Sequence, residues 1–468
     1  MLLVKLTTLR KLDASVMKRI AAAICLTGAC FITNAQDNSP YSRYGLGDEI
    51  SSSSATSRGM GGVSAAYNSY SSVNYANPAS YSFFLSIPEP GTRKQLQGRA
   101  ILDIGIEGTG HTLIDQSKQS RFTSSNLIFN RISLGVPLRR NWGMAFGLRP
   151  LNRISYKMQQ SGRLKDENTG VDIDSAITVF EGSGGAYLAS LGTGVKFALA
   201  KSHYLSLGVN GGYLFGSKDY ARHRSFFNDT TLYRTGTWDT KTSMGGLYAD
   251  AGLQYQGKMS DKLYLGIGVF GNWQQKINTH TTLTSSSIDN STGVPDTAYT
   301  SGEQTGNIIY PTNLTAGFIL QKAQSQTEAG WLFGADFTTT NWQNYRENNL
   351  PDTAVASNWK LKVGAEFSPV NKKNYLSQMY YRVGFFTGPD YIKLRGKQLP
   401  LYGITAGVGL PLANYNQQAR GQATIINLGL EYMKRGNNDS PLQENMYRIT
   451  VGFSLTDMWF GKRRNGDR

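Results

Sequence analysis

The stretch "NWKLKVGAEFS" at residues 358–368 alternates apolar and polar side chains along its whole length. One face of a strand here would carry only apolar groups: Trp359, Leu361, Val363, Ala365 and Phe367. At ~3.3 Å per residue and a tilt of ~40°, the rise from Trp359 to Phe367 is roughly 20 Å, close to the ~25 Å apolar band of an outer-membrane barrel. The stretch predicts a strand with lipid on one side and water on the other.

The same period of two residues recurs along most of the chain. Counting such segments predicts about 14 strands, near 99–109, 123–138, 142–158, 182–199, 203–223, 239–257, 262–281, 310–321, 329–343, 356–368, 377–391, 400–412, 421–433 and 446–457. We therefore expect an all-β fold, a transmembrane antiparallel β-barrel over 99–457. A secreted β-sandwich or propeller is the alternative, but its strands are usually shorter and a propeller repeats every ~40 residues.

The connections between these segments alternate in length. Short connections occur at 139–141, 200–202 and 258–261. Long polar connections are expected near 159–181, 224–238, 282–309 and 434–445. An even number of strands, with short turns on one side and long loops on the other, is the layout of bacterial outer-membrane barrels. It places both chain ends in the periplasm.

Residues 1–35 have the composition of a secretory signal peptide. Basic residues come first, an apolar run follows, and small residues lead to Ala35. Met17 is an alternative start. Both cysteines, Cys25 and Cys30, fall in this segment, so the mature chain would have no disulfide. We expect export to the outer membrane of a Gram-negative bacterium after cleavage near Ala35; a lipoprotein signal acylated at Cys30 is the alternative.

Residues 36–98 precede the first predicted strand and are rich in Ser, Gly, Asn and Tyr. Such a segment is too long for a simple tail, and we predict that it forms a plug, or hatch, inside the barrel. A serine run at 51–54 and low hydrophobicity leave a disordered periplasmic tail as the alternative.

The stretch "SRGMGGVSAAYNSYSSVNYANPAS" at 57–80 carries the strongest signals within this segment. Its glycines at 59, 61 and 62 permit positive φ and close approach to a barrel wall. Asn77 and Pro78 predict a turn that folds the segment back on itself.

This stretch resembles the entrance of the FadL-type outer-membrane transporters of long-chain fatty acids and other hydrophobic compounds. Their hatch carries a Gly-Met-Gly segment, followed by a run of small residues ending in Asn-Pro-Ala. The matching positions, with the adjoining arginine, are the predicted ligand and plug residues: Arg58, Gly59, Met60, Gly61, Gly62, Asn77, Pro78 and Ala79. The resemblance implies a 14-stranded barrel plugged by the hatch, which agrees with the strand count.

Two further pieces resemble a branch of FadL-like barrels that includes the type IX secretion shuttle protein. They are "SPYSRYGLGD" at 39–48 and "FSLTDMWFGKRR" at 453–464. The specific motifs are confined to the hatch and the last strand. High asparagine and serine content after Met60 departs from the fatty-acid transporters and leaves the ligand open.

Motifs for catalysis are weak. "GIGVFG" at 266–271 has dinucleotide-binding spacing but lies within a predicted strand rather than before a helix. The four histidines are scattered, without the spacing of a metal site. We therefore expect no enzyme activity, no cofactor and no metal. An outer-membrane hydrolase built on His with Ser or Asp from different strands is the alternative.

Charged residues fall into two groups. The first should line the lumen of the barrel. These residues form a polar or weakly cationic conduit, anchor the plug, or simply pair with one another: Arg131, Arg149, Lys196, Asp250, Arg382 and Arg448. The second is a basic rim at the predicted periplasmic turns and in a tail at 458–468. The formal charge of +16 falls to about +12 without the signal peptide. This rim fits outer-membrane lipid or a periplasmic or membrane protein partner, and it lacks the aromatic interleaving of a nucleic-acid groove.

Two functions follow as expectations. The FadL resemblance implies transport or binding of hydrophobic small molecules such as fatty acids, through an apolar pocket near the hatch. The alternative is a non-transporting partner barrel of a protein secretion or outer-membrane assembly complex.

Overall fold

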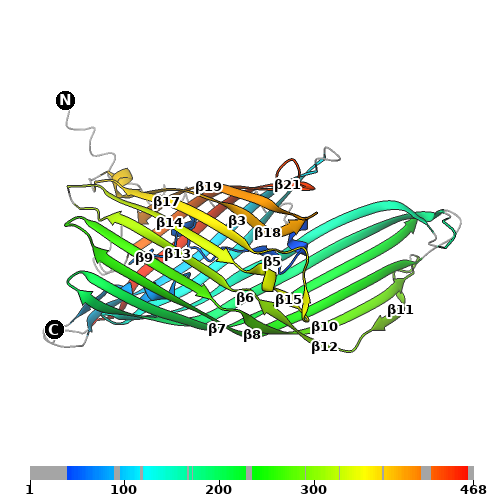
Figure 1. Ribbon diagram of the computed structural model, residues 1–468, viewed down its shortest axis with the longest axis horizontal. Helices are drawn as coiled ribbons and strands as arrows, with labels where there is room; N and C mark the ends of the chain where they lie inside the picture. Colours follow the sequence, from blue (N-terminus) through cyan, green and yellow to red (C-terminus); the bar gives the residue numbers. More distant parts are fainter. Residues whose placement is uncertain are drawn as a thin grey trace, which may run out of the picture.

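One antiparallel sheet closes on itself to form the wall of the molecule (Figure 1). The structure is a computed structural model that describes residues 39–461, apart from 89–94, 116–119, 166–167, 171, 228–233, 290, 326, 371–373 and 413–422. The predicted signal peptide and residues 462–468 of the predicted tail lie outside the described residues. No helix in the described part of the chain is long and apolar enough to span a membrane.

Consecutive strands of the wall pair with one another, and the last strand, β21, pairs with the first wall strand, β3, to close the barrel. The wall has 14 strand positions, because β9 and β10 share one and β12 and β13 share another. The strands of the wall and its extensions are β3 (Gln95–Asp115), β4 (Ser120–Arg139), β5 (Trp142–Lys165), β6 (Asp172–Ala200), β7 (His203–Phe227), β8 (Thr235–Lys258), β9 (Leu263–Asn272), β10 (Gln275–Ile288), β11 (Pro295–Thr300), β12 (Gln304–Tyr310), β13 (Asn313–Lys322), β14 (Gly330–Thr340), β15 (Arg346–Glu347), β16 (Leu350–Pro351), β17 (Asn358–Ser368), β18 (Tyr380–Leu394), β19 (Lys397–Leu412), β20 (Ala423–Arg435) and β21 (Leu442–Gly461).

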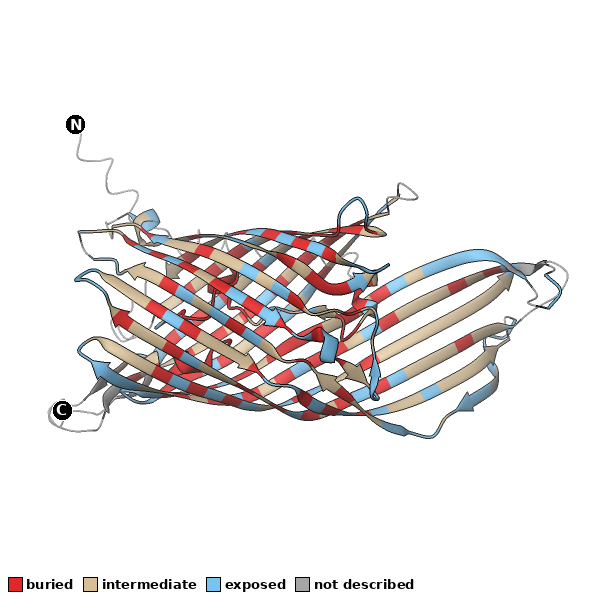
Figure 2. Ribbon diagram, viewed as in Figure 1, coloured by how far each residue is buried: buried red, intermediate tan, exposed pale blue. Residues whose placement is uncertain are grey.

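The predicted strands are confirmed, since every predicted segment overlaps an observed wall strand. Buried and exposed positions alternate along β14 and along much of the wall (Figure 2). Trp359 and Phe367, at the two ends of the apolar face of β17, are 43% and 50% exposed. Their outward position shows that the apolar face of this strand is the one expected to meet lipid.

The predicted long connections near 159–181, 224–238 and 282–309 are wrong as loops. The strands β5, β6, β7, β8 and β10 continue through most of these stretches and project beyond the rest of the barrel (Figure 1). Hairpin hydrogen bonding persists outside lipid, where strands need no apolar face, so apolar alternation did not reveal these parts. The connection expected at 434–445 is present and short, between Arg435 and Leu442.

Residues 39–88, here called the N-terminal segment, lie within the barrel (Figure 1). The segment contains η2 (Pro40–Arg43), β1 (Asp48–Glu49), α2 (Ala55–Arg58), η3 (Pro78–Phe83) and β2 (Ser86–Pro88). Helix α2 packs against β19–β21, whereas η3 packs against β4–β8 on another part of the wall. The segment therefore crosses the lumen. Two short helices outside it, η4 (Trp342–Asn344) and η5 (Tyr375–Gln378), belong to connections of the wall.

The N-terminal segment also completes the wall where β4 and β5 separate. Strand β4 pairs with β5 only between Ile132 and Arg139. Beyond that point, β1 pairs with β5 at Asn152 and Arg153, and the backbone N–H of Ser39 donates to the carbonyl oxygen of Ser155 at 3.0 Å. The segment thus covers the part of the β5 edge that is not paired with β4.

Apolar packing joins the segment to the wall at several places. Tyr41 and Leu46 belong to a cluster with Trp342 and Tyr391, two residues outside the segment whose rings stack at 4.3 Å between centroids. Deeper in the lumen, Met60 packs in a second cluster that includes wall residues. Burial of these side chains stabilises the segment inside the barrel.

Candidate functional site

The turn after α2 lies directly on the barrel wall. Gly61 and Gly62 have φ angles of 67° and 88°, a region that favours glycine. The hydroxyl of Thr405 on β19 donates to the carbonyl oxygen of Gly59 at 3.1 Å and accepts from the N–H of Gly61 at 2.9 Å. A Cβ added to Gly384 of β18 would lie 2.0 Å from the nitrogen of Gly61. The segment can approach the wall this closely because both Gly61 and Gly384 lack a side chain.

Arg58, at the end of α2, enters a balanced group of two arginines and two glutamates. Its Nη2 lies 2.9 Å from Oε2 of Glu107 on β3, and its Nη1 lies 3.7 Å from Oε2 of Glu431 on β20. Arg448 of β21 pairs with the same two carboxylates, at 2.6 Å from Glu107. Arg58 is only 4% exposed. The group holds α2 to three strands by ion pairs largely removed from water.

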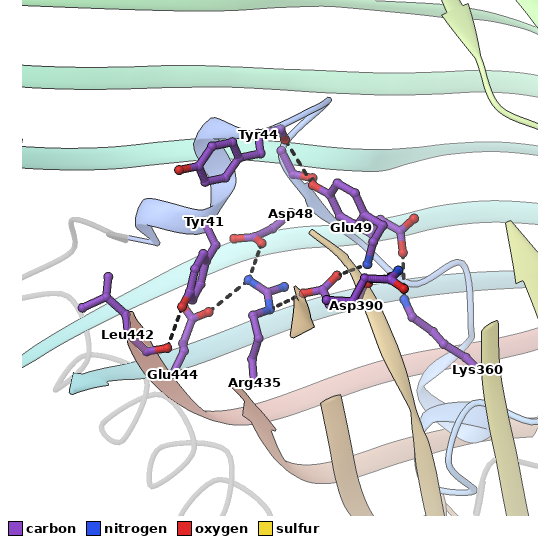
Figure 3. A network of polar contacts seen from close by, with 12 residues as sticks. Tyr41, Tyr44, Asp48, Glu49, Lys360, Asp390, Arg435, Leu442 and Glu444 are labelled. Carbon is purple, nitrogen blue, oxygen red and sulfur yellow. Dashed lines mark hydrogen bonds and ion pairs between the residues drawn. The ribbon is translucent and has the colours of Figure 1, made fainter. Parts of the chain in front are cut away.

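A second charged group surrounds Arg435 at the end of β20 (Figure 3). Its guanidinium lies 2.8 Å from Asp48 of β1, 2.7 Å from Asp390 of β18 and 3.0 Å from Glu444 of β21. Asp390 and Glu444 are 2% and 0% exposed. One arginine therefore holds two wall carboxylates and one carboxylate of the N-terminal segment.

Neighbouring contacts extend this Arg435 group across the segment (Figure 3). Glu49, next to Asp48, pairs with Nζ of Lys360 on β17 at 2.8 Å. The hydroxyl of Tyr41 donates to the carbonyl oxygen of Leu442 at 2.5 Å. Both acidic residues of β1 are thus tied to different strands of the wall.

Sequence reasoning missed the Arg435 group. The stretch "SPYSRYGLGD" at 39–48 was used only for its resemblance to a protein family, and no contact was predicted for it. It supplies Tyr41 and Asp48 to this group. The available signal was the pair Asp48 and Glu49, the only charged residues between Arg43 and Arg58, because acidic residues inside a barrel need cationic partners.

A carboxylate on β14 holds the middle of the segment. Oδ2 of Asp336 accepts from the backbone N–H groups of Ser64 at 2.7 Å and Ala65 at 2.9 Å. The carbonyl oxygen of Ala65 accepts from the side chains of Asn77 at 2.7 Å and Gln254 at 2.9 Å. Asn77 therefore links two parts of the segment, and this link produces the fold-back that the sequence predicted.

Asn77 also begins η3, with its side-chain oxygen accepting from the N–H of Ala79 at 3.1 Å. The carbonyl oxygen of Ala79 accepts from the hydroxyl of Ser206 on β7 at 2.6 Å. Pro78 lies against Gly208 of the same strand. The Asn-Pro-Ala motif is therefore buried against the wall.

We predict that Gly208→Ala destabilises the protein by about 1–3 kcal/mol through overpacking. The added Cβ would lie 2.2 Å from the carbonyl carbon of Pro78 and 2.3 Å from the nitrogen of Ala79. Urea unfolding in detergent, followed by tryptophan fluorescence, measures the change. Gly211→Ala is the matched control, because its Cβ would meet no atom within 4 Å. Equal stability of the two variants would contradict the placement of η3.

Comparison with known proteins assigns the chain to a family. A family model described as BamG matches residues 16–465. The chain belongs to the BamG family. No curated protein matches it.

Several solved structures share the fold of this BamG-family barrel. The toluene transporter TodX of P. putida is 15% identical, with a TM-score of 0.52 over 89% of this chain and 100% of that one. The TodX deltaS2S3 mutant monoaromatic hydrocarbon channel is also 15% identical, with a TM-score of 0.51 over 86% and 98%. A Pseudomonas aeruginosa FadL homologue is 12% identical, with a TM-score of 0.47 over 88% and 98%. The predicted barrel fold is confirmed, and TodX shares it.

Three predicted lumen cations of this BamG-family barrel contact the N-terminal segment. Arg131 donates to the carbonyl oxygen of Ser52 at 3.1 Å. The guanidinium of Arg149 lies 5.9 Å from the ring centre of Tyr75, and Nζ of Lys196 lies 4.7 Å from that of Phe83. Together with Arg448, which shares its carboxylates with Arg58, they hold or border the segment.

The other two predicted lumen residues pair with the wall. Asp250 accepts from the side chain of Asn210 at 2.7 Å. Arg382 pairs with Glu366 at 2.6 Å and donates to Asn427 at 3.0 Å. The predicted lumen residues therefore do not form one site, and they divide between segment contacts and wall contacts.

A cavity of about 240 Å³ remains beside the glycine turn. Charged side chains from the segment and the wall line it: Glu49, Arg58, Arg149, Asp250, Lys360, Lys362, Asp390, Glu431, Arg435 and Arg448. Clefts for drug-sized ligands usually hold ~300–1,000 Å³ and are mostly apolar. This cavity next to the predicted hatch is smaller, and apolar side chains such as Leu151, Phe386 and Met433 line it beside the charged ones.

Proposed function

We propose that this BamG-family barrel is a plugged, non-conducting barrel of the Gram-negative outer membrane that serves as a structural partner in an assembly or secretion complex. The N-terminal segment is the plug, delivered after signal cleavage near Ala35. The observation that carries the proposal is the attachment of this segment by two separate buried charged groups, around Arg58 and Arg435.

Releasing the plug would be costly. Breaking a buried ion pair by removal of one partner costs about 3–5 kcal/mol, because the remaining charge stays buried without compensation. Movement of α2 away from the wall would leave Glu107 and Glu431 with one arginine between them. Movement of β1 would separate Asp48 from Arg435 and expose an edge of β5. A barrel that opens in each transport cycle would gain little from this arrangement.

The hairpins beyond the membrane band offer a surface for partners. Strands of 24–29 residues, β5–β8, are far longer than the ~9–11 residues needed to cross the bilayer. The excess length forms a projecting sheet (Figure 1). At the opposite, short-turn end, the predicted basic rim includes the exposed Arg139 and Arg140. Both ends can therefore contact other proteins while the lumen stays closed.

Transport of hydrophobic small molecules is the second candidate. The observation in its favour is the fold shared with the toluene transporter TodX. In this function, a ligand such as a fatty acid enters from the long-hairpin end, and displacement of residues 58–62 opens a route inward or sideways into the bilayer.

The molecules that co-purify with the native protein distinguish the two functions. We expect mass spectrometry of the protein purified in mild detergent to find stoichiometric protein partners and no stoichiometric apolar compound in the lumen. A bound fatty acid or aromatic hydrocarbon that is lost when Gly59–Gly62 are replaced by bulkier residues would overturn the partner proposal.

A disulfide that ties the N-terminal segment to the wall tests whether the segment must move for function. The Cβ of Ala66 lies 3.3 Å from the position that a Cβ on Gly266 of β9 would take, close to the ~3.5–4.5 Å of a disulfide. The chain has no cysteine after Cys30. Oxidised Ala66→Cys/Gly266→Cys protein should retain its partners fully. Uptake of a hydrophobic compound that stops on oxidation and returns on reduction would instead support transport.

A further inference from the structure

The outer face of the barrel carries an apolar groove that is separate from the lumen. It has a volume of about 870 Å³ and spans β5–β8 and the break between β9 and β10. Six of its lining residues carry the argument: Phe146, Leu191, Gly211, Tyr213, Leu247 and Lys276. The first five are exposed on the outward side of the wall.

Two features of the wall create the groove. Gly211 occupies an outward position between Val209 and Tyr213, and a Cβ there would meet no atom within 4 Å. The strand ladder is also interrupted between β9 and β10, where the side chain of Gln275 accepts from the N–H of Ala249 at 2.8 Å and donates to its carbonyl oxygen at 2.7 Å. A missing side chain and a local break thus leave a hollow.

The lining indicates that lipid covers this hollow. Leu247 is 80% exposed and Trp273, at the strand break, is 55% exposed. Tyr213 and Trp273 are the residue types that lie at the edge of the apolar band. Side chains this apolar and exposed on a membrane barrel meet acyl chains, and the volume lies within the ~300–1,000 Å³ of ligand clefts.

Lys276 gives the groove a charged end. It is exposed on β10, toward the hairpin that projects from the membrane. No ion pair or hydrogen bond joins its amino group to another residue within the described chain. A lysine at the membrane surface attracts anionic lipid, contributing about 1 kcal/mol.

We propose that this groove is a binding site for an anionic, phosphate-bearing lipid of the outer leaflet. One acyl chain lies over Gly211 between Leu191 and Leu247, and the lipid phosphate lies at Lys276. The site does not rest on the proposed function, because its outward residues take no part in the ion pairs that hold the N-terminal segment. Ser190, which also lines the groove, meets the segment through hydrogen bonds with the hydroxyl of Tyr75.

Native mass spectrometry of delipidated protein tests the site, with phosphatidylglycerol and phosphatidylcholine of equal chain length as probes. We expect one phosphatidylglycerol to bind about fivefold more tightly than phosphatidylcholine, the factor that corresponds to about 1 kcal/mol. Gly211→Trp should abolish the binding of both lipids by filling the groove. Lys276→Glu should remove the preference but retain phosphatidylcholine.

Two variants serve as matched controls. Gly162→Trp places the same side chain at another open glycine, in the projecting part of β5, and Lys241→Glu reverses an exposed charge farther along β8. Both should bind like the unmodified protein. Lipid binding that survives Gly211→Trp, equal competition by inorganic phosphate, or photo-crosslinking from position 211 to a protein chain instead of lipid would overturn the proposal.

Discussion

Replacing Arg435 by Met is expected to lower the free energy of unfolding by at least about 3–5 kcal/mol. The change leaves Asp390 and Glu444 buried with no guanidinium between them, and it also releases Asp48 from β20. The N-terminal segment should detach at β1, where a protease can then cut it. Urea unfolding in detergent measures the energy, and the rate of cleavage within residues 39–50 measures the detachment.

Arg435→Lys is a milder variant for the same measurements if Arg435→Met does not fold. Lysine retains the charge but loses the fork that meets several carboxylates, so the loss should be smaller. Lys258→Met is the control, because it removes an exposed pair with Asp261 in a short turn and should change neither readout. Cleavage of the segment at the native rate in Arg435→Met would show that the Arg435 group does not hold it.

Replacing Arg58 by Met is expected to destabilise the protein by about 3–5 kcal/mol and to loosen α2. Glu107 and Glu431 would then share Arg448 alone, leaving one excess negative charge in a site shielded from water. The same urea unfolding measures the loss, and hydrogen exchange at residues 55–62 measures the loosening of α2.

A second substitution that restores the charge balance should compensate for the loss of Arg58. Arg58→Met/Glu107→Gln leaves one arginine, Arg448, with one glutamate, Glu431, so we expect the double variant to recover a large part of the stability. The two substitutions should therefore be strongly non-additive, as expected of residues in one network. Additive losses would indicate that Arg58 acts through packing alone.

The wall of the barrel could be predicted from sequence because lipid imposes a period of two on every crossing strand. The stretch at 358–368 shows the effect directly, and β17 spans Asn358–Ser368 as predicted. The projecting parts of β5–β8 could not be predicted in this way. In water a strand needs no apolar face, so the polar stretch at 159–181 had the composition of a loop.

The glycine turn at 59–62 and the Asn77 turn were predictable because their backbone requirements are visible in residue type. The Arg435 group was not, since its members lie far apart in the chain and meet only through strand register. Asp48 reaches Arg435 because β1 pairs with β5 at the gap beside β4. No local pattern in the sequence contains that gap.

Conductance across a planar lipid bilayer tests most directly whether the N-terminal segment closes the barrel. The native protein should show no steady channel, whereas a variant lacking residues 39–88 should open stepwise, ohmic channels through the emptied lumen. Steady conductance by the native protein, equal to that of the shortened variant, would contradict the account.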